Sequence, residues 1–232
     1  MSGFWRFFRY GLLGIAILVA LLIAIPVIYL TAGSVYQSRV HYTHHYRLVL
    51  EIEDHGEIRT GSSVIGVSFS PTPPWTVYRL GSPWTRFHGE AVVVELSTGQ
   101  VVVATLMHGP RGNTEQMQSL ASRTLGANAP GNLRDAPNWT GKGEVTGSDI
   151  PTMLLFKSRD EPSGGRWVAP DEFEEKIGPN IQFRRMTLEM TSDPVTRQIE
   201  EKLPFMARDW DELREEARSK GGGVPQRRIL TR

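Results

Sequence analysis

Three consecutive stretches decide the fold of the larger, C-terminal part of this chain: YRLVLEIE at residues 46–53, the turn DHG at 54–56 and EIRTGSSVIGVSF at 57–69. Every second residue from Tyr46 to Ile52 is apolar, which is the period of a strand with one buried face. The turn between the two stretches predicts an antiparallel hairpin. The segment Gly61-Ser62-Ser63 interrupts the second strand, which indicates either a bulge or a close approach of another backbone.

Further strands are expected on the C-terminal side. Residues 90–96 and 101–106 flank the turn STGQ, and their many valines suit strands that are buried on both faces. Residues 153–156 and 181–191 predict two more strands.

The helices expected between and after these strands are short. They cover a segment from Asn113 or Thr114 to Leu125, and residues 171–177, 193–203 and 209–219, while residues 127–149 are expected to form a loop. We therefore predict an α+β fold, in which one N-terminal transmembrane helix precedes a mostly antiparallel sheet domain with several short helices.

On the N-terminal side, residues 11–30 form an uncharged run rich in Leu, Ile, Val and Ala. As a helix this run spans roughly 30 Å, the thickness of the hydrocarbon core of a bilayer. Aromatic residues flank it on both sides, as in an interfacial belt. The run is longer than a signal peptide's apolar region, but the small residues at 31–34 leave cleavage open as the alternative.

These features predict four parts: a tail and signal anchor at 1–33, a juxtamembrane linker at 34–45, an exported α+β domain at 46–219, and a disordered basic tail at 220–232. The short N-terminal tail with Arg6 and Arg9 favours an N-in orientation. We expect a single-pass protein of the cell inner membrane that contacts lipid through residues 11–30 and places its C-terminal domain in the periplasm.

Composition narrows the classes of function. The 232 residues have a net charge of +1, and residues 34–232 carry 24 Lys+Arg against 25 Asp+Glu. So little basic excess argues against a nucleic-acid partner. The chain has no cysteine, which excludes disulfides, cysteine-ligated zinc and a cysteine nucleophile. No phosphate-binding loop, dinucleotide fingerprint, nucleophile elbow or paired-histidine zinc motif is present, so no cofactor and no catalytic residue are predicted.

Three histidines follow the apolar run. His41, His44 and His45 could hold a metal ion through two or three imidazoles. On an extended chain His41 and His45 share a face, while His44 points the other way. On a helix, His41 would instead share a face with both His44 and His45. The alternative is a polar linker whose histidines are solvated or respond to pH.

Two tryptophans beside prolines form a second candidate site. Trp75 ends the segment PTPPW, and Trp84 follows Pro83. Exposed tryptophans are unfavourable in water, so these two either fold back on the sheet or bind a partner.

A resemblance to other proteins indicates a cellular location. The segments 46–53, 60–65 and 89–106, with 168–171 and 177–179, resemble bacterial membrane-anchored or exported proteins of unknown function. The resemblance implies the bacterial envelope and no particular activity.

The resulting hypothesis is a membrane-anchored envelope protein whose exported domain acts as a binding or accessory subunit for an envelope protein. The alternative is an anchored hydrolase whose active site is assembled from distant loops, with His88 or His108 as the base.

Overall fold

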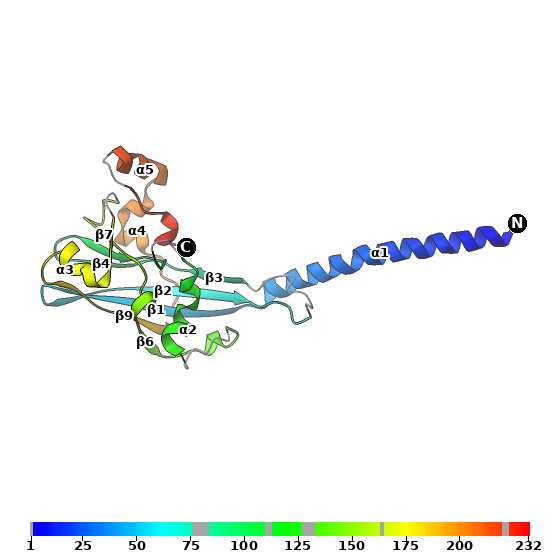
Figure 1. Ribbon diagram of the computed structural model, residues 1–232, viewed down its shortest axis with the longest axis horizontal. Helices are drawn as coiled ribbons and strands as arrows, with labels where there is room; N and C mark the ends of the chain where they lie inside the picture. The colour runs from blue at the N-terminus through cyan, green and yellow to red at the C-terminus, as the bar shows by residue number, and fades with distance from the viewer. Residues whose placement is uncertain (1, 76–83, 110–112, 127–132, 163–164, 220–222) are drawn as a thin grey trace. The chain divides into compact units, whose positions relative to one another are not determined.

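The computed structural model describes residues 2–75, 84–109, 113–126, 133–162, 165–219 and 223–232, with side chains from residue 13 onward (Figure 1). The predicted α+β class is confirmed: a long apolar helix is followed by two antiparallel sheets and several short helices. The chain forms two compact units, one of residues 1–41 and 70–84, the other of residues 42–69 and 85–232. The loop that holds Pro83 lies outside the described residues.

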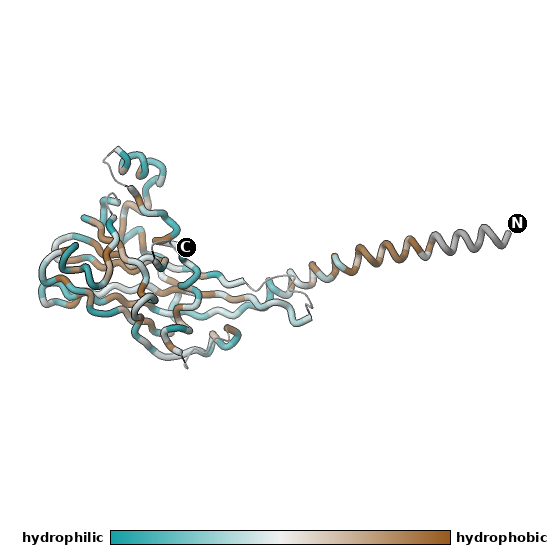
Figure 2. The backbone as a smooth tube through the Cα atoms, viewed as in Figure 1, coloured by the Kyte–Doolittle hydropathy of each residue, from teal (hydrophilic) through white to brown (hydrophobic). Residues whose placement is uncertain are grey.

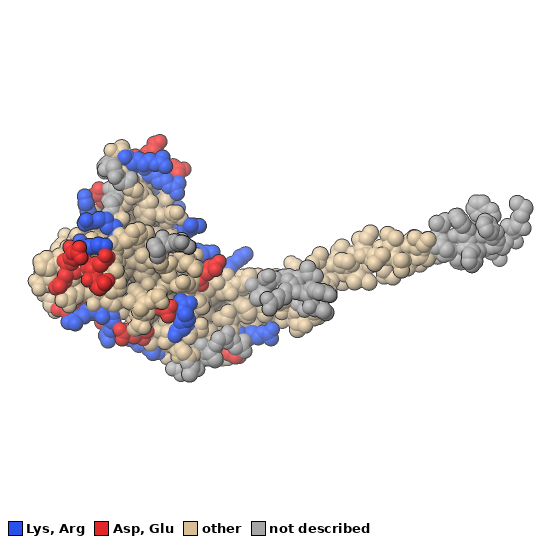
Figure 3. All heavy atoms as spheres, in the orientation of Figure 1, with Lys and Arg blue, Asp and Glu red and all other residues tan. Residues whose placement is uncertain are grey.

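The first unit is built on helix α1, Ser2–Arg39. From Leu13 to Arg39 it has a mean hydropathy of 2.9 in its most apolar window, where no residue is buried. Its length and composition suffice to cross a membrane. Figure 2 shows the apolar stretch along the helix, and Figure 3 shows uncharged side chains along most of its described part, which ends at the basic Arg39.

The helix is longer than the predicted span. Residues 34–45, which we expected to form a linker, divide between the last turns of α1 and the start of strand β1. The amide of Val40 donates to the carbonyl of Tyr36 at 2.8 Å and so continues the helical pattern past Arg39. The alternation of buried and exposed residues that begins at Thr43 then favours a strand.

The second unit contains two sheets. The five-stranded sheet has the order β3-β2-β1-β9-β6, and the four-stranded sheet has the order β4-β5-β7-β8. Their bounds are β1 Tyr42–Asp54, β2 Glu57–Ser70, β3 Trp84–His88, β4 Val92–Glu95, β5 Val101–Ala104, β6 Lys142–Val145, β7 Met153–Phe156, β8 Arg166–Val168 and β9 Ile181–Thr191.

Strand β1 is the centre of the larger sheet. Its alternate residues from Tyr46 to Ile52 are buried, as their spacing predicts, and they form a core with apolar residues of the second sheet. The hairpin with β2 keeps a continuous register through Gly61. Of the two readings of this glycine, the close approach is confirmed: a Cβ on Gly61 would lie 2.2 Å from the carbonyl oxygen of Val93 in β4.

Short helices cover the sheets. The α-helices are α2 Gln116–Leu125, α3 Phe173–Lys176, α4 Ile199–Lys202 and α5 Trp210–Ser219, and the 3₁₀ turns are η2 Ala136–Asn138, η3 Gly147–Asp149, η4 Pro170–Glu172, η5 Pro204–Ala207 and η6 Arg227–Ile229. A second apolar cluster joins the other face of β4, β5 and β7 to α4, η5, α5 and η6. The helix expected over 193–203 is shortened to α4, and the loop expected over 127–149 contains β6.

Residues 223–232, which belong to the segment expected to form a disordered tail, make contacts within the second unit. Ile229 and Leu230 are buried in the second apolar cluster. The amide of Ala91 donates to the carbonyl of Leu230 at 2.8 Å, and Gly89 and Arg232 exchange two backbone hydrogen bonds of 3.0 Å. Two apolar side chains and an available backbone partner outweigh the basic, glycine-rich composition of this segment.

Candidate functional site

The candidate site arises where strand β9 leaves the five-stranded sheet. The register of β9 with β1 runs from Ile181 opposite Asp54 to Thr191 opposite His45. Beyond Thr191 the chain turns aside, because Asp193 is held by two side chains of β1. His45 donates from Nδ1 to the carbonyl oxygen of Asp193 at 2.7 Å, and the guanidinium of Arg47 pairs with its carboxylate.

The departure of β9 leaves one edge of β1 open. Residues 42–44 pair with β2 on one side, and on the other side no strand of the described residues continues β9. Across the gap, the carbonyl of Gly141 accepts from the amide of Met190 at 3.0 Å, and turn η2 packs beside β1. We call the gap the β9 notch: the cavity of about 520 Å³ lined by 43–45, 136–137, 139–141 and 190–192.

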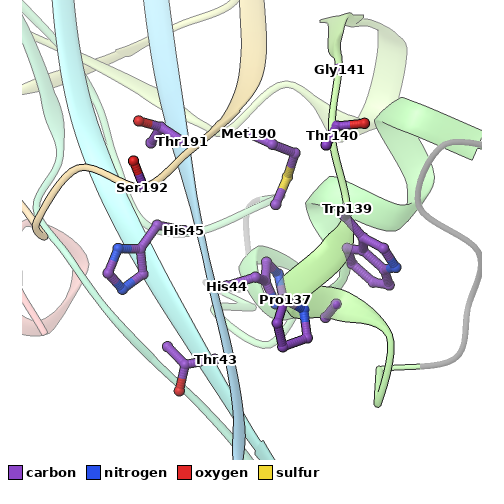
Figure 4. A pocket seen from close by; sticks show the side chains of 11 residues that line it. Thr43, His44, His45, Pro137, Trp139, Thr140, Gly141, Met190, Thr191 and Ser192 are labelled. Atoms are coloured by element: carbon purple, nitrogen blue, oxygen red, sulfur yellow. The ribbon is translucent and has the colours of Figure 1, made fainter.

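Side chains from both faces of the sheet line the β9 notch (Figure 4). His44 points toward Pro137 and Trp139, whereas His45 leaves β1 in the opposite direction. Met190 lies opposite Tyr46 and Thr191 opposite His45, so these two also belong to different faces. The cavity therefore passes through the plane of the sheet, in the line that β9 would follow if it continued.

His44 is the most unusual residue of the notch. It is 5 % exposed, its ring centroid lies 4.9 Å from that of Trp139, and its Nε2 atom has no hydrogen-bond partner among the described residues. Burial lowers the pKa of His44 to about 4, with a smaller contribution from the charge of His45. The ring is therefore neutral at physiological pH, and its unpaired nitrogen costs about 1–3 kcal/mol.

The other lining groups are mostly apolar rings and hydroxyls. Trp139 is 6 % exposed and its indole N–H has no partner among the described residues. Thr43, Thr140, Thr191 and Ser192 add hydroxyls, and no Lys, Arg, Asp or Glu of the described residues lines the cavity. The notch thus combines an apolar wall with neutral hydrogen-bonding groups, which suits an uncharged polar ligand.

The metal-ligand role of His41, His44 and His45 remains a prediction. His44 and His45 lie on opposite faces of β1, and His45 already uses Nδ1. His41 is exposed in the first unit. Within the described residues no group of three or more His, Cys, Asp or Glu side chains could hold a metal ion.

The tryptophans lie elsewhere. Trp75 is 45 % exposed and packs edge-on against Tyr36 of α1, with ring centroids 5.0 Å apart. Trp84 is half-buried at the first position of β3. A partner for either tryptophan remains a prediction.

The two histidines of the hydrolase hypothesis occupy different surroundings. His108 is 3 % exposed, donates from Nε2 to the carbonyl of Asp149 at 2.8 Å, and has its pKa lowered by burial. His88 lines a second cavity, of about 530 Å³, together with Glu90. Burial raises the pKa of Glu90, whose carboxylate accepts from the amides of Gln198 and Ile199 at 2.6 and 3.0 Å and so secures the start of α4.

Of the notch residues, the sequence singled out only His44 and His45, and as metal ligands. Trp139, Met190 and the hydroxyl residues gave no signal, because the cavity exists only where a distant strand ends. Comparison with known proteins found no family model, no curated protein and no solved structure that matches this chain.

Proposed function

We propose that the protein is a single-pass protein of a bacterial inner membrane whose second unit, on the periplasmic side, binds an envelope protein. The observation that carries the anchor is helix α1. The aliphatic side chains from Leu13 to Leu30 are about half or more exposed on all sides of the helix. A helix that is apolar all round requires either a protein core or lipid around it, and this one is outside any core.

Aromatic residues near the end of α1 support the same proposal. The hydroxyl of Tyr29 donates to the carbonyl of Trp75 at 3.2 Å, and Tyr36 packs edge-on against the Trp75 ring. The hydroxyl of Ser70 donates to the carbonyl of Gln37 at 3.2 Å, which ties the segment 70–75 to the same helix. Such amphipathic rings favour the headgroup region, so we assign Trp75 to the membrane interface.

The binding role rests on the β9 notch. Its unpaired polar atoms, His44 Nε2 and Trp139 Nε1, are buried, and its walls carry neither a nucleophile–base pair nor a group of metal ligands among the described residues. Recognition explains such a lining better than catalysis does, because apolar walls with a few neutral polar groups are typical of binding sites.

The anchor is tested by alkaline carbonate extraction and by the mass of the mature protein. We expect the full chain to stay in the membrane pellet with residues 1–33 attached. A control in which residues 1–33 are removed should be released by carbonate. A mature protein that begins near residue 34 would show a cleaved signal and would overturn the anchor.

The orientation is tested separately with a reporter fused after residue 232. Alkaline phosphatase, which is active only in the periplasm, should be active in this fusion. A fluorescent protein that folds only in the cytoplasm should stay dark when exported through the same fusion site. The reverse pair of results would place the second unit in the cytoplasm and contradict the proposal.

A further inference from the structure

We propose that the β9 notch binds an extended, uncharged segment of the partner protein, which pairs as a short strand with residues 42–44 of β1 in the line of β9. The inference rests on the proposed partner-binding function and names the chemistry of the bound segment. Three observations carry it: an open strand edge, a cavity that crosses the sheet, and a lining that has no Lys, Arg, Asp or Glu among the described residues.

The open edge supplies the backbone partner. In an antiparallel ladder the amide and carbonyl of successive residues point alternately to the two neighbours. Between Tyr42 and His44, at least one residue therefore directs both groups to the side where β9 has ended. An added strand satisfies such groups by main-chain hydrogen bonds, which is the basis of strand addition in peptide recognition.

The shape of the notch fits a strand. Consecutive side chains of an extended peptide point to opposite faces of a sheet. Here one face offers the space beside His44, Trp139 and Met190, and the other offers the space beside His45 and Thr191. A peptide in the line of β9 would place alternate side chains in these two spaces.

The residues that line the β9 notch determine which side chains of a bound peptide would fit there. A charged side chain facing His44 would lose its hydration without meeting a Lys, Arg, Asp or Glu side chain, because none of the described residues of these types lines the cavity. A small hydroxyl or amide side chain would avoid this loss, because it is uncharged and would face the buried ring of His44. We therefore expect Ser, Thr or Asn at the inward position.

A neutral saccharide has similar polar groups, but the notch suits it less well. Sugar rings bind by lying flat on an exposed aromatic face, and the ring of Trp139 is 94 % buried beside His44. The strand edge also offers backbone groups that only another backbone matches in spacing. The peptide is the occupant that uses both features.

The test uses the full chain in lipid nanodiscs and a library of capped hexapeptides composed of Val, Thr, Ser, Ala and Asn. Calorimetry should find binders, and N-methylation of the central residue of a binder should weaken it at least about tenfold. Hydrogen exchange at residues 42–44 should slow on binding. Ser192→Arg, which places a long cation in the notch, should abolish binding, whereas Thr60→Arg on the exposed part of β2 should leave it unchanged.

Each contrary result counts against the proposal. Binders that tolerate N-methylation, binding that survives Ser192→Arg, or a library without binders would overturn strand addition. Binding of neutral oligosaccharides with slowed exchange at residues 42–44, in place of peptides, would overturn it in favour of a sugar site.

A second experiment separates failure of the mechanism from failure of the proposed function. A photocrosslinking amino acid is placed in cells at Thr140, on the rim of the notch, or at Trp167, which is 47 % exposed in β8 of the other sheet. Specific adducts from Thr140 agree with both proposals. Adducts from Trp167 alone retain partner binding and overturn strand addition, and a lack of adducts from both positions overturns partner binding as well.

Discussion

Replacement of Gly61 by alanine should strongly destabilise the second unit. A Cβ at this position would lie 2.2 Å from the carbonyl oxygen and 2.9 Å from the carbonyl carbon of Val93, and 2.8 Å from a methyl group of Val94. Ordinary contacts begin near 3.4 Å, so the carbonyl oxygen would have to retreat by about 1.2 Å. That oxygen belongs to the backbone of β4, which is paired residue for residue with β5, and it has no rotamer by which to yield.

The expected size of the effect follows from two opposed terms. Inserting an atom into a packed core usually costs about 1–3 kcal/mol and occasionally more. Exchange of glycine for alanine returns about 0.4–1 kcal/mol, because the unfolded chain becomes less flexible. Since the obstacle is backbone, we expect a net loss of about 3 kcal/mol, which for a domain of this size lowers Tm by roughly 6–12 °C.

The assay is thermal unfolding of the full chain in detergent, followed by near-ultraviolet circular dichroism. Gly223→Ala is the matched control, because a Cβ there meets no atom within 4 Å, and its Tm should not change. A Gly61→Ala protein that melts within about 2 °C of the parent would refute the close approach of β2 to β4.

Three further variants test other contacts. Asp54→Ala should cost about 2–4 kcal/mol in a denaturant titration, because the buried carboxylate accepts from the amide and hydroxyl of Ser97 at 2.6 and 2.9 Å; the exposed control Asp160→Ala should be neutral. Burial works to raise the pKa of Asp54, but hydrogen bonds from His55 and Ser97 and the charge of Arg59 outweigh burial and lower the pKa. The stability that the ionised Asp54 contributes is therefore present above about pH 4 and is lost as the pH falls through the lowered pKa of the folded protein. The pKa of His44 falls to about 4 in the folded protein, so the unfolded chain takes up the proton first as the pH is lowered, and the free energy of unfolding should drop by up to about 3 kcal/mol between about pH 6.5 and 4. His44→Gln should flatten this part of the stability profile. A slope equal to that of the parent protein would contradict the buried neutral ring. Tyr46→Phe should cost about 1 kcal/mol in the same titration by removing the buried hydrogen bond of 2.8 Å to the carbonyl of Met117, and an unchanged midpoint would mean that water replaces it.

Local patterns predicted much of the fold. The period-two burial of β1, the hairpin turn at 54–56 and the apolar run within α1 each depend on neighbours in sequence, and each is present. Gly61 was also informative, because a glycine inside a strand often marks a bulge or a close approach of another backbone.

Long-range contacts account for what local patterns missed. The Asp193-Pro194 pair has the composition of a helix start, but the side chains of His45 and Arg47 hold Asp193 from 146 residues or more away and draw the chain aside. The basic composition of the C-terminal segment likewise gave no sign that Ile229 and Leu230 enter an apolar cluster. The β9 notch depends on the first of these contacts, so local patterns could not reveal it.

The pairing of β1 with β9 has a consequence for the folding of the chain during its synthesis. Its hairpin partner β2 follows at once, whereas β9 lies more than a hundred residues later in the chain. At synthesis rates of about 5–20 residues per second, the second edge of β1 stays unpaired for roughly 6–25 s. An exposed strand edge of thirteen residues is a template for aggregation during that delay. The nascent chain should therefore depend on a chaperone until residues 181–191 emerge, and slowed synthesis should increase its aggregation.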